Sequence, residues 1–136
     1  MTRKTWQRRA GTVLAAAAAG VVFASGTSYA DDRSVYTDDQ NGYAYWTENG
    51  DTLEVCDLHS DGWGVRGYVY RPKSGDPGNG TVLIKASDPK YDGYASDFCV
   101  AVSVNVDENI RLSLKVCKYK GARIANCGYA AIPGRD

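Results

Sequence analysis

Hydrophobic and polar residues alternate most clearly in residues 110–119 of this chain. The segment IRLSLKVC (residues 110–117) places isoleucine, leucine and valine at every second position, with polar residues or cysteine between them. A period of two predicts a β-strand with one face in a core and the other toward water. Residues 98–104 (FCVAVSV) repeat the pattern, so we expect Phe98, Val100, Val102 and Val104 to point inward.

From Gly42 onward, further short hydrophobic runs alternate with turn residues. The expected strands cover residues 43–47, 52–56, 65–71, 81–86, 98–104, 110–119 and 123–132. No helical period of 3.6 residues occurs, and Asn49-Gly50 is a strong hairpin signal. About seven short strands predict an all-β fold, either a small antiparallel sandwich of the immunoglobulin-like kind or a small barrel. In residues 81–86 we expect Val82, Ile84 and Ala86 to share the inward face.

Residues 1–30 predict a signal peptide that is cleaved on export. Arginine and lysine at positions 3, 4, 8 and 9 precede an apolar run over residues 12–24, and Ser28-Tyr29-Ala30 supplies the small residues of a cleavage site. This order of regions is typical of secretory signals. The alternative is a membrane anchor, but such a run forms a helix of about 20 Å, shorter than the ~30 Å hydrocarbon core. We therefore expect an extracellular protein without a membrane attachment.

The remainder of the chain divides into two parts. Residues 31–41 (DDRSVYTDDQN) are polar and lack periodicity, which predicts a flexible N-terminal arm. Residues 42–136 then form a single β domain, because a chain of this length holds one hydrophobic core.

All four cysteines, Cys56, Cys99, Cys117 and Cys127, follow the signal. An even number in a small exported chain predicts two disulfides. A zinc site is the alternative, but the chain has no C-x₂₋₄-C pair and one histidine, so we expect no metal and no cofactor. Three connectivities are possible, and the last hairpin favours Cys117–Cys127, which leaves Cys56–Cys99. Because Cys56, Cys99 and Cys117 are out of phase with the aliphatic residues of their strands, their sulfur atoms should lie off the core face.

The net charge of the chain after residue 30 limits the possible partners. Four of the 16 basic residues and none of the 16 acidic residues lie in residues 1–30, so the rest of the chain has a net charge of −4. Nucleic acid and anionic membrane surfaces bind to clusters of lysine and arginine. No such cluster occurs along the chain, so we expect neither as a partner.

Candidate catalytic groups are few. His59 lies in the segment DLHSD (residues 57–61), but a catalytic triad brings its members together from separate segments, so we interpret this segment as a solvated turn. The glutamates at positions 48, 54 and 108 could pair as in a glycosidase, but a domain this small seldom forms the required cleft. We therefore expect the protein not to be an enzyme.

Calcium is a further alternative. Asp57-x₃-Asp61-Gly62 and Asp88-x₃-Asp92-Gly93, with Asp97 nearby, are rich in oxygen ligands. Neither segment matches the D-x-[DN]-x-[DN]-G loop, and Asp-Gly is common in turns. We interpret both segments as turns.

The aromatic residues are the best candidates for a contact surface. Tyr68 and Tyr70 are out of phase with Val65 and Val69, and Trp63 precedes them in a loop. Exposed tyrosine and tryptophan are enriched at recognition surfaces, so Trp63, Tyr68 and Tyr70 form the predicted binding patch. The alternative is that tyrosines pair across strands and stabilise the sheet. A bulge before Tyr70 would reverse its face.

Several segments together resemble a known family. These are GDTLEVCD (residues 50–57), DGWGVR (residues 61–66), LKVC (residues 114–117) and Cys127. Over most of residues 48–129 they resemble a group of small exported actinobacterial proteins with a G-D-x-x-x-V-C-D … D-G-x-x-V block and four cysteines. The resemblance implies a bacterial exported protein with a four-cysteine framework and a small β fold, and it implies no active-site residues.

These observations favour a secreted, non-catalytic binding or interaction domain. Its expected partner is an extracellular protein or a cell-wall polysaccharide. The alternative is a proteinaceous inhibitor of an extracellular hydrolase, because a small disulfide-linked domain is preorganised and loses little entropy on binding.

Overall fold

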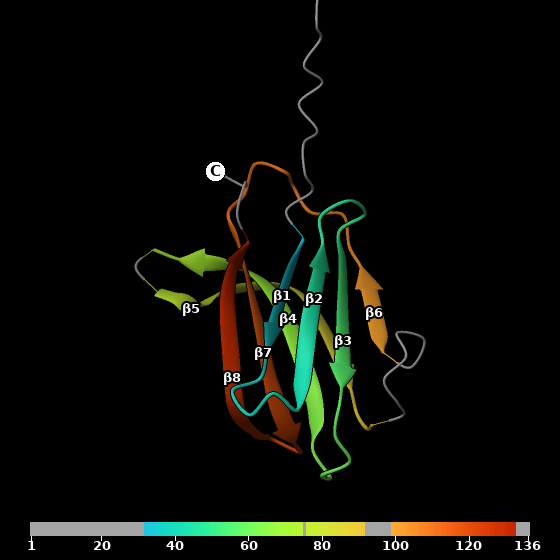
Figure 1. The fold of residues 1–136 in the computed structure, drawn as a ribbon. Helices are drawn as coiled ribbons and strands as arrows, with labels where there is room; N and C mark the ends of the chain where they lie inside the picture. Colours follow the sequence, from blue (N-terminus) through green and yellow to red (C-terminus); the bar gives the residue numbers. More distant parts are fainter. Residues whose placement is uncertain (1–31, 75, 92–98, 133–136) are drawn as a thin grey trace, which may run out of the picture.

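The computed structural model describes residues 32–74, 76–91 and 99–132, and their regular structure consists of eight β-strands (Figure 1). The strands are β1 (Arg33–Tyr36), β2 (Gly42–Thr47), β3 (Thr52–Asp57), β4 (Gly64–Lys73), β5 (Asp76–Asp88), β6 (Val100–Ser103), β7 (Leu112–Lys120) and β8 (Arg123–Ile132). The expected signal peptide, residues 1–30, lies outside the described residues. Within those residues, no helix has the length and apolar character needed to cross a membrane.

The strands form two antiparallel sheets that pack face to face. The N-terminal sheet has the order β1-β2-β3-β6, and the C-terminal sheet has the order β5-β4-β7-β8. The predicted all-β sandwich with two disulfides is therefore confirmed, with one strand more than expected. An immunoglobulin constant domain orders its strands A-B-E-D and C-F-G, so the likeness is one of architecture and not of connection.

The core between the sheets comes from the alternating positions of the strands. Its fully buried members include Ala44, Trp46, Leu53, Val55, Val65, Val69, Leu112, Leu114 and Val116. The inward phase predicted for residues 110–119 is thus confirmed at β7. Val100 and Val102 also pack against this core. The inward placement of Val104 is wrong, because Val104 follows the end of β6 and is 42% exposed.

The predicted flexible arm is wrong for residues 33–37. Arg33–Tyr36 forms β1, which pairs with β2 so that Val35 lies opposite Ala44. Thr37 is buried, its amide donates to the Gly42 carbonyl (2.9 Å), and its hydroxyl oxygen accepts from the Gly42 amide (3.1 Å). Backbone pairing to the edge of β2 orders this segment, and four residues with one apolar side chain are too few to display a period.

A β-bulge in β5 changes the direction of the β4–β5 hairpin. Val69 pairs with Ile84 and Tyr70 pairs with Val82, which leaves Leu83 as the extra residue. Ile84 is buried, but Val82 beyond the bulge is 52% exposed, so the inward placement of Val82 is wrong. A bulge bends its strand and increases the local twist. The distal part of the hairpin accordingly projects past the edge of the sandwich (Figure 1).

Both predicted disulfides are present. Cys56–Cys99 joins β3 to the segment before β6, and Cys117–Cys127 joins β7 to β8. The second bridge lies at a bulge, because Val116 pairs with Gly128 and Lys118 pairs with Ala125. The cysteines of β3 and β7 lie on the outer faces of the sheets, as their phase predicts, yet Cys56 and Cys117 are almost completely buried. Neighbouring side chains cover them.

The first and last strands close one side of the sandwich. The amide of Asp38 donates to the Asn126 carbonyl (3.0 Å). At Gly128, a Cβ atom would overlap the Tyr36 carbonyl oxygen, so only glycine permits this approach of β8 to the end of β1. The domain is therefore held together at β1 and β8 as well as through its core.

Candidate binding surface

Two of the three predicted contact residues, Tyr68 and Tyr70, lie at outward positions of β4. Tyr68 pairs with Lys115 of β7, and Tyr70 pairs with Ser113. Because Leu114 and Val116 of β7 point into the core, Lys115 and Ser113 lie on the opposite face. Tyr68 and Tyr70 therefore share the outer face of the C-terminal sheet, as their phase indicated.

Tyr70 is nevertheless buried, and the expected exposure of its side chain is wrong. Its exposed fraction is 2%, and burial raises the pKa of its hydroxyl. Beyond its bulge, β5 passes over the outer face before the hairpin projects, since a Cβ atom on Gly78 would lie 3.4 Å from the Tyr129 ring. Tyr70 lines a hollow of about 180 Å³ together with Tyr68, Gly78, Asn79, Gly80, Val82 and Lys115. Tyr70 thus forms part of the wall of this hollow and exposes almost none of its own surface.

Trp63 lies apart from the two tyrosines. It is half-buried just before β4, with the Arg123 guanidinium carbon 5.3 Å from its ring centroid. It borders a different hollow, with Asp57 and His59 among its lining residues. Five residues of extended chain separate Trp63 from Tyr68, which corresponds to roughly 17 Å. The structure therefore does not bring Trp63, Tyr68 and Tyr70 together in one patch.

Tyr68 instead belongs to a row of side chains that crosses the whole C-terminal sheet. Lys85, Tyr68, Lys115 and Tyr129 are consecutive partners on β5, β4, β7 and β8, and we call these four residues the Lys–Tyr row. The Lys115 ammonium lies 5.6 Å from the Tyr68 ring centroid and 5.4 Å from that of Tyr129. Such distances are typical of cation–π contacts.

The Lys–Tyr row is accessible to a ligand. Lys85 is exposed, Tyr129 is 49% exposed, and Tyr68 and Lys115 are half-buried. Sequence reasoning missed Lys85, Lys115 and Tyr129. The signal for Lys115 was present, because it alternates with Leu114 and Val116 in the clearest strand of the chain. The neighbours that it meets depend on the pairing of β4, β7 and β8.

A second cation lies on an aromatic ring of the same outer face. The Arg66 guanidinium carbon is 4.1 Å from the Tyr119 ring centroid, and Arg66 Nε donates to Ser87 Oγ at 2.8 Å. Arg66 pairs with Cys117, one outward position from the Lys–Tyr row. The stacked and hydrogen-bonded guanidinium therefore has a fixed direction.

Basic residues are concentrated in the strands of the C-terminal sheet. These strands contain eight basic and two acidic residues, whereas those of the N-terminal sheet contain one basic and two acidic residues. The basic residues of the C-terminal sheet are Arg66, Arg71, Lys73, Lys85, Lys115, Lys118, Lys120 and Arg123. The expectation that neither nucleic acid nor an anionic membrane is a partner rested on the absence of a cluster along the chain, and it stays a prediction. Strand pairing places Arg66, Lys85 and Lys115 of three adjacent strands on one outer face.

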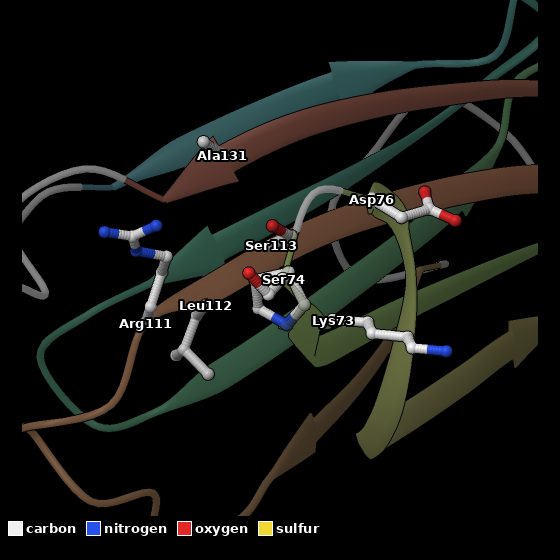
Figure 2. A pocket seen from close by; sticks show the side chains of 8 residues that line it. Lys73, Ser74, Asp76, Arg111, Leu112, Ser113 and Ala131 are labelled. Atoms are coloured by element: carbon white, nitrogen blue, oxygen red, sulfur yellow. The ribbon is translucent and has the colours of Figure 1, made fainter.

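A further hollow does not hold a convergent set of polar groups. It measures about 340 Å³ and lies between the β4–β5 hairpin and the start of β7. Figure 2 shows Lys73, Asp76 and Arg111 at its rim with their charged ends pointing apart. This geometry offers no pair of groups for acid–base chemistry.

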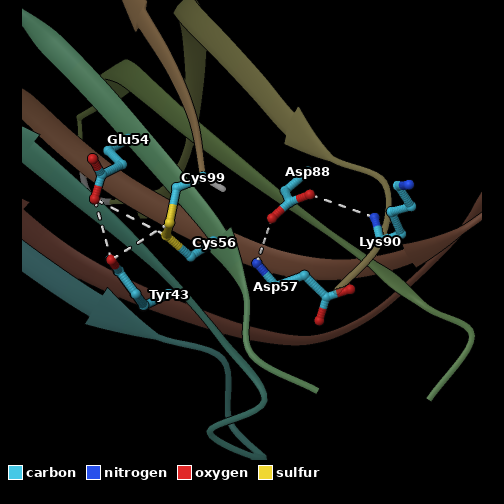
Figure 3. Close-up of a disulfide and its surroundings, with 7 residues drawn as sticks. All are labelled: Tyr43, Glu54, Cys56, Asp57, Asp88, Lys90 and Cys99. Atoms are coloured by element: carbon cyan, nitrogen blue, oxygen red, sulfur yellow. Dashed lines mark hydrogen bonds between the residues drawn. A yellow bond between two sulfur atoms is a disulfide. The ribbon is translucent and has the colours of Figure 1, made fainter. Parts of the chain in front are cut away.

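A buried carboxylate pair lies near the β3–β4 loop. Asp88 Oδ2 accepts from the Asp57 amide (2.8 Å), and Asp57 Oδ1 accepts from the His59 amide (3.1 Å). Asp57 is 3% exposed, and its Oδ2 atom has no hydrogen-bond partner in the part of the chain that the structure describes. Burial and the charges of Asp88 and Asp61 raise the pKa of Asp57. In Figure 3 the Asp57 carboxylate points away from Asp88.

The geometry of these aspartates does not assemble a metal site. Asp61 is engaged by Lys118 instead of turning toward Asp57. Among the described residues, one group of three potential metal ligands lies close together, namely Glu54, Cys56 and Cys99. The sulfur atoms of that group are joined in a disulfide (Figure 3), so they cannot act as thiolate ligands. Asp92 and Asp97 lie outside the described residues.

Lys118 connects the loops of both sheets at one end of the sandwich. Its buried ammonium donates to Asp39 (2.8 Å) and to Asp61, and Asn126 Nδ2 donates to the same Asp39 carboxylate (3.0 Å). Burial alone would raise the pKa of Asp39, but these hydrogen bonds lower it to about 2. This arrangement stabilises the fold, and its charges are already compensated.

Comparison with models of protein families gives no match, and neither curated proteins nor solved structures match this chain.

Proposed function

We propose that this protein is a secreted, non-catalytic binding domain, and that its contact surface is the outer face of the C-terminal sheet around the Lys–Tyr row. The observation that carries the proposal is the placement of Lys115 between the rings of Tyr68 and Tyr129 on an accessible face. Tyrosine offers a large contact area with few rotatable bonds. Because four paired strands hold the row, little order has to be gained on binding.

The charge distribution supports the choice of this face. Lys85 and Lys115 form no ion pair within the described residues, whereas Lys118 at the end of the sandwich is bound by two carboxylates. Cations that have no acidic partner among the described residues attract and orient a ligand of opposite charge. The Lys–Tyr row thus combines contact area with electrostatic attraction.

Export forms part of the proposal. Two disulfides in a small all-β domain are consistent with an extracellular protein, because disulfides persist in oxidising compartments. The signal pattern of residues 1–30 supports the same location. A bacterial envelope or its surroundings would then supply the partner.

The test compares two tyrosines of similar exposure on opposite sheets. Tyr129 is 49% exposed in the row, and Tyr36 is 51% exposed on β1. The purified mature protein and its Tyr129→Ala and Tyr36→Ala variants are incubated with culture supernatant and cell-envelope fractions. We expect Tyr129→Ala to weaken retention at least 10-fold, as for an interface anchor, and Tyr36→Ala to leave it unchanged. Equal retention of all three folded proteins would contradict the proposal.

Inhibition of an extracellular hydrolase is the second candidate function. The observation in its favour is the β4–β5 hairpin, whose distal part projects from the sandwich (Figure 1) and could enter a cleft. Lys73, near the tip, is exposed. We expect an inhibitor to lower the activity of secreted proteases or glycosidases at micromolar concentration, and a Lys73→Ala variant to lose that effect. Inhibition that instead depends on Tyr129 would place the inhibitory contact on the Lys–Tyr row.

A further inference from the structure

We infer that the Lys–Tyr row recognises an acidic polysaccharide in which charged and neutral sugars alternate. This inference rests on the proposed binding function and names the ligand class of the same surface. It is carried by the order of the row, which alternates cation and ring from strand to strand, and by the charge of the sheet that holds it.

The spacing of the row matches a chain of sugar rings. Adjacent strands lie about 4.8 Å apart, which is close to the advance per ring of an extended pyranose chain. A polysaccharide lying across the strands therefore presents one sugar to each residue of the row. Lys85 and Lys115 stand two strands apart, about 10 Å, and so do Tyr68 and Tyr129. Carboxylates on every second sugar would meet the lysines, and the faces of the intervening sugars would meet the tyrosine rings.

The electrostatics of Lys115 favour a carboxylate ligand. Lys115 is half-buried, its ammonium lies near two aromatic rings, and it has no acidic partner in the described residues. An ammonium that has lost part of its water shell gains more from an anion than a fully hydrated one, because the local dielectric constant is lower. The rings on either side limit the directions from which the anion can approach.

A hollow beside the row provides room for a substituent. It measures about 180 Å³, and its walls include Tyr68, Val82 and Lys115. Val82 is 52% exposed there because the bulge at Leu83 turns it outward. An apolar side chain next to a cation suits an N-acetyl group or a similar substituent on a sugar ring.

A polysaccharide fits these observations better than a nucleic acid. A nucleic acid carries a phosphate on every unit, whereas the row offers a cation on every second strand. The binding of single-stranded DNA is therefore an outcome that would overturn the inference.

The probe is hyaluronate, in which glucuronate alternates with N-acetylglucosamine. Chitin oligosaccharides serve as the neutral comparison, polygalacturonate as the comparison with a charge on every sugar, and oligo(dT) as the nucleic acid. Binding of the mature protein is measured by titration calorimetry at low salt. We expect hyaluronate to bind at least 10-fold more tightly than each comparison and to weaken several-fold in 0.5 M NaCl. Tighter binding of oligo(dT) or polygalacturonate would overturn the alternating class of ligand.

Two lysines of β7 give a matched pair of variants. Lys115→Met removes the cation of the row and keeps the length of the side chain, whereas Lys120→Met removes an exposed cation at the end of the same strand. We expect Lys115→Met to weaken hyaluronate binding at least 10-fold and Lys120→Met to change it less than twofold. Equal losses would indicate nonspecific attraction and would overturn the inference.

Two further results keep the test decisive. If Lys115→Met fails to fold, Lys85→Met removes the exposed cation of the row at the edge strand β5, and we expect it to weaken binding at least threefold. If none of the four polymers binds while the retention of envelope material still depends on Tyr129, the ligand class is wrong and the proposed binding function stands. If retention does not depend on Tyr129, the binding function itself fails.

Discussion

The two outer faces of the sandwich use the same residue type in opposite ways. On the N-terminal sheet, Tyr43 Oη donates to Glu54 Oε1 at 3.1 Å and Tyr45 Oη donates to Asp32 Oδ2 at 2.9 Å. On the C-terminal sheet, the rings of Tyr68 and Tyr129 lie near the Lys115 ammonium, and the Tyr119 ring lies near Arg66. Tyr43 and Tyr45 thus interact through their hydroxyls, whereas Tyr68, Tyr119 and Tyr129 interact with cations through their rings.

The difference follows from the charge of the neighbours. A carboxylate can accept only from the hydroxyl, whereas a cation is attracted to the face of the ring. Burial and the nearby Glu54 charge raise the pKa of Tyr43 to about 12, and the hydrogen bond to Asp32 raises the pKa of Tyr45. Both phenols therefore remain donors at neutral pH. Tyrosine counts alone do not reveal a binding face, because on the N-terminal sheet the hydroxyls are already engaged.

The largest expected effect on the free energy of unfolding comes from removing a disulfide, and each sheet contains one. Cys56–Cys99 lies on the N-terminal sheet and has a sequence separation of 43, and Cys117–Cys127 lies on the C-terminal sheet with a separation of 10. In the chain-entropy model these closures contribute about 4 and about 3 kcal/mol. We expect the Cys56→Ala/Cys99→Ala variant to lose more free energy of unfolding in urea than Cys117→Ala/Cys127→Ala. The reverse order would show that local strain and packing outweigh loop length.

Lys118 gives the next largest effect, because its buried ammonium is bound by two loop carboxylates, Asp39 and Asp61. Lys118→Met leaves Asp39 and Asp61 without their shared donor, and we expect it to lower the free energy of unfolding by about 2–3 kcal/mol. Lys120→Met is the control and should change it by less than ~0.5 kcal/mol. Urea denaturation at pH 7 measures both.

The same ion pairs predict that the free energy of unfolding decreases at acidic pH. The folded-state pKa of Asp39 is about 2 and that of Asp61 is also lowered, so their stabilising contribution is present above the unfolded-state pKa of ~4. It is lost as the pH falls from about 4 toward 2. We expect the wild-type protein to lose stability steeply over this range and Lys118→Met to show a flatter curve. Parallel curves would mean that other carboxylates dominate the acid response.

Removing the charge of Asp57 should have a smaller effect of opposite sign, because it should raise the free energy of unfolding. Its pKa is raised, chiefly by burial, so its charging costs stability as the pH rises through the folded-state pKa. Asp57→Asn keeps an oxygen that can accept from the His59 amide and removes the charge. We expect the variant to be about 1 kcal/mol more stable at pH 7, with the gain vanishing near pH 3. Asp38→Asn, at an exposed position, is the control, and a destabilised Asp57→Asn protein would contradict this account.

The smallest effect tests the comparison of the faces most directly. Tyr43→Phe removes a hydroxyl that is hydrogen-bonded to Glu54, and we expect a loss of about 1 kcal/mol in the free energy of unfolding. Tyr68→Phe keeps the ring near Lys115 and should change stability by less than ~0.5 kcal/mol. It should also retain hyaluronate binding within about twofold, because the ring supplies the contact. A Tyr68→Phe variant that lost binding would show that the hydroxyl is used on both faces.

The sequence predicted those parts of the fold in which a period of two runs through a single strand. The core phase of β7, the all-β sandwich and both disulfides follow from alternation and cysteine spacing. The prediction failed where pairing between strands decides the outcome. One extra residue at Leu83 turned Val82 outward, and the distal part of β5 lies beside Tyr70, which is buried although its phase was right.

The candidate surface shows the same division. Tyr68 could be placed on the outer face from β4 alone. The neighbours on which its proposed role depends, Lys115 and Tyr129, come from β7 and β8, and no pattern within one segment indicates that these strands are adjacent. The basic character of the C-terminal sheet was hidden for the same reason, because its cations are separated along the chain and meet only in the paired strands.

The approach of β8 to β1 has a consequence for how the domain could be rearranged. Residue Arg33 begins β1 and Ile132 ends β8 at the same end of the sandwich (Figure 1), and Gly128 brings the two strands together. The ends of the domain can therefore be joined by a short linker and new ends opened elsewhere, as in circular permutation. A chain opened at the tip of the β4–β5 hairpin would keep every strand pair, both disulfides and the Lys–Tyr row. The order in which the strands are synthesised is thus separable from the order in which they pack.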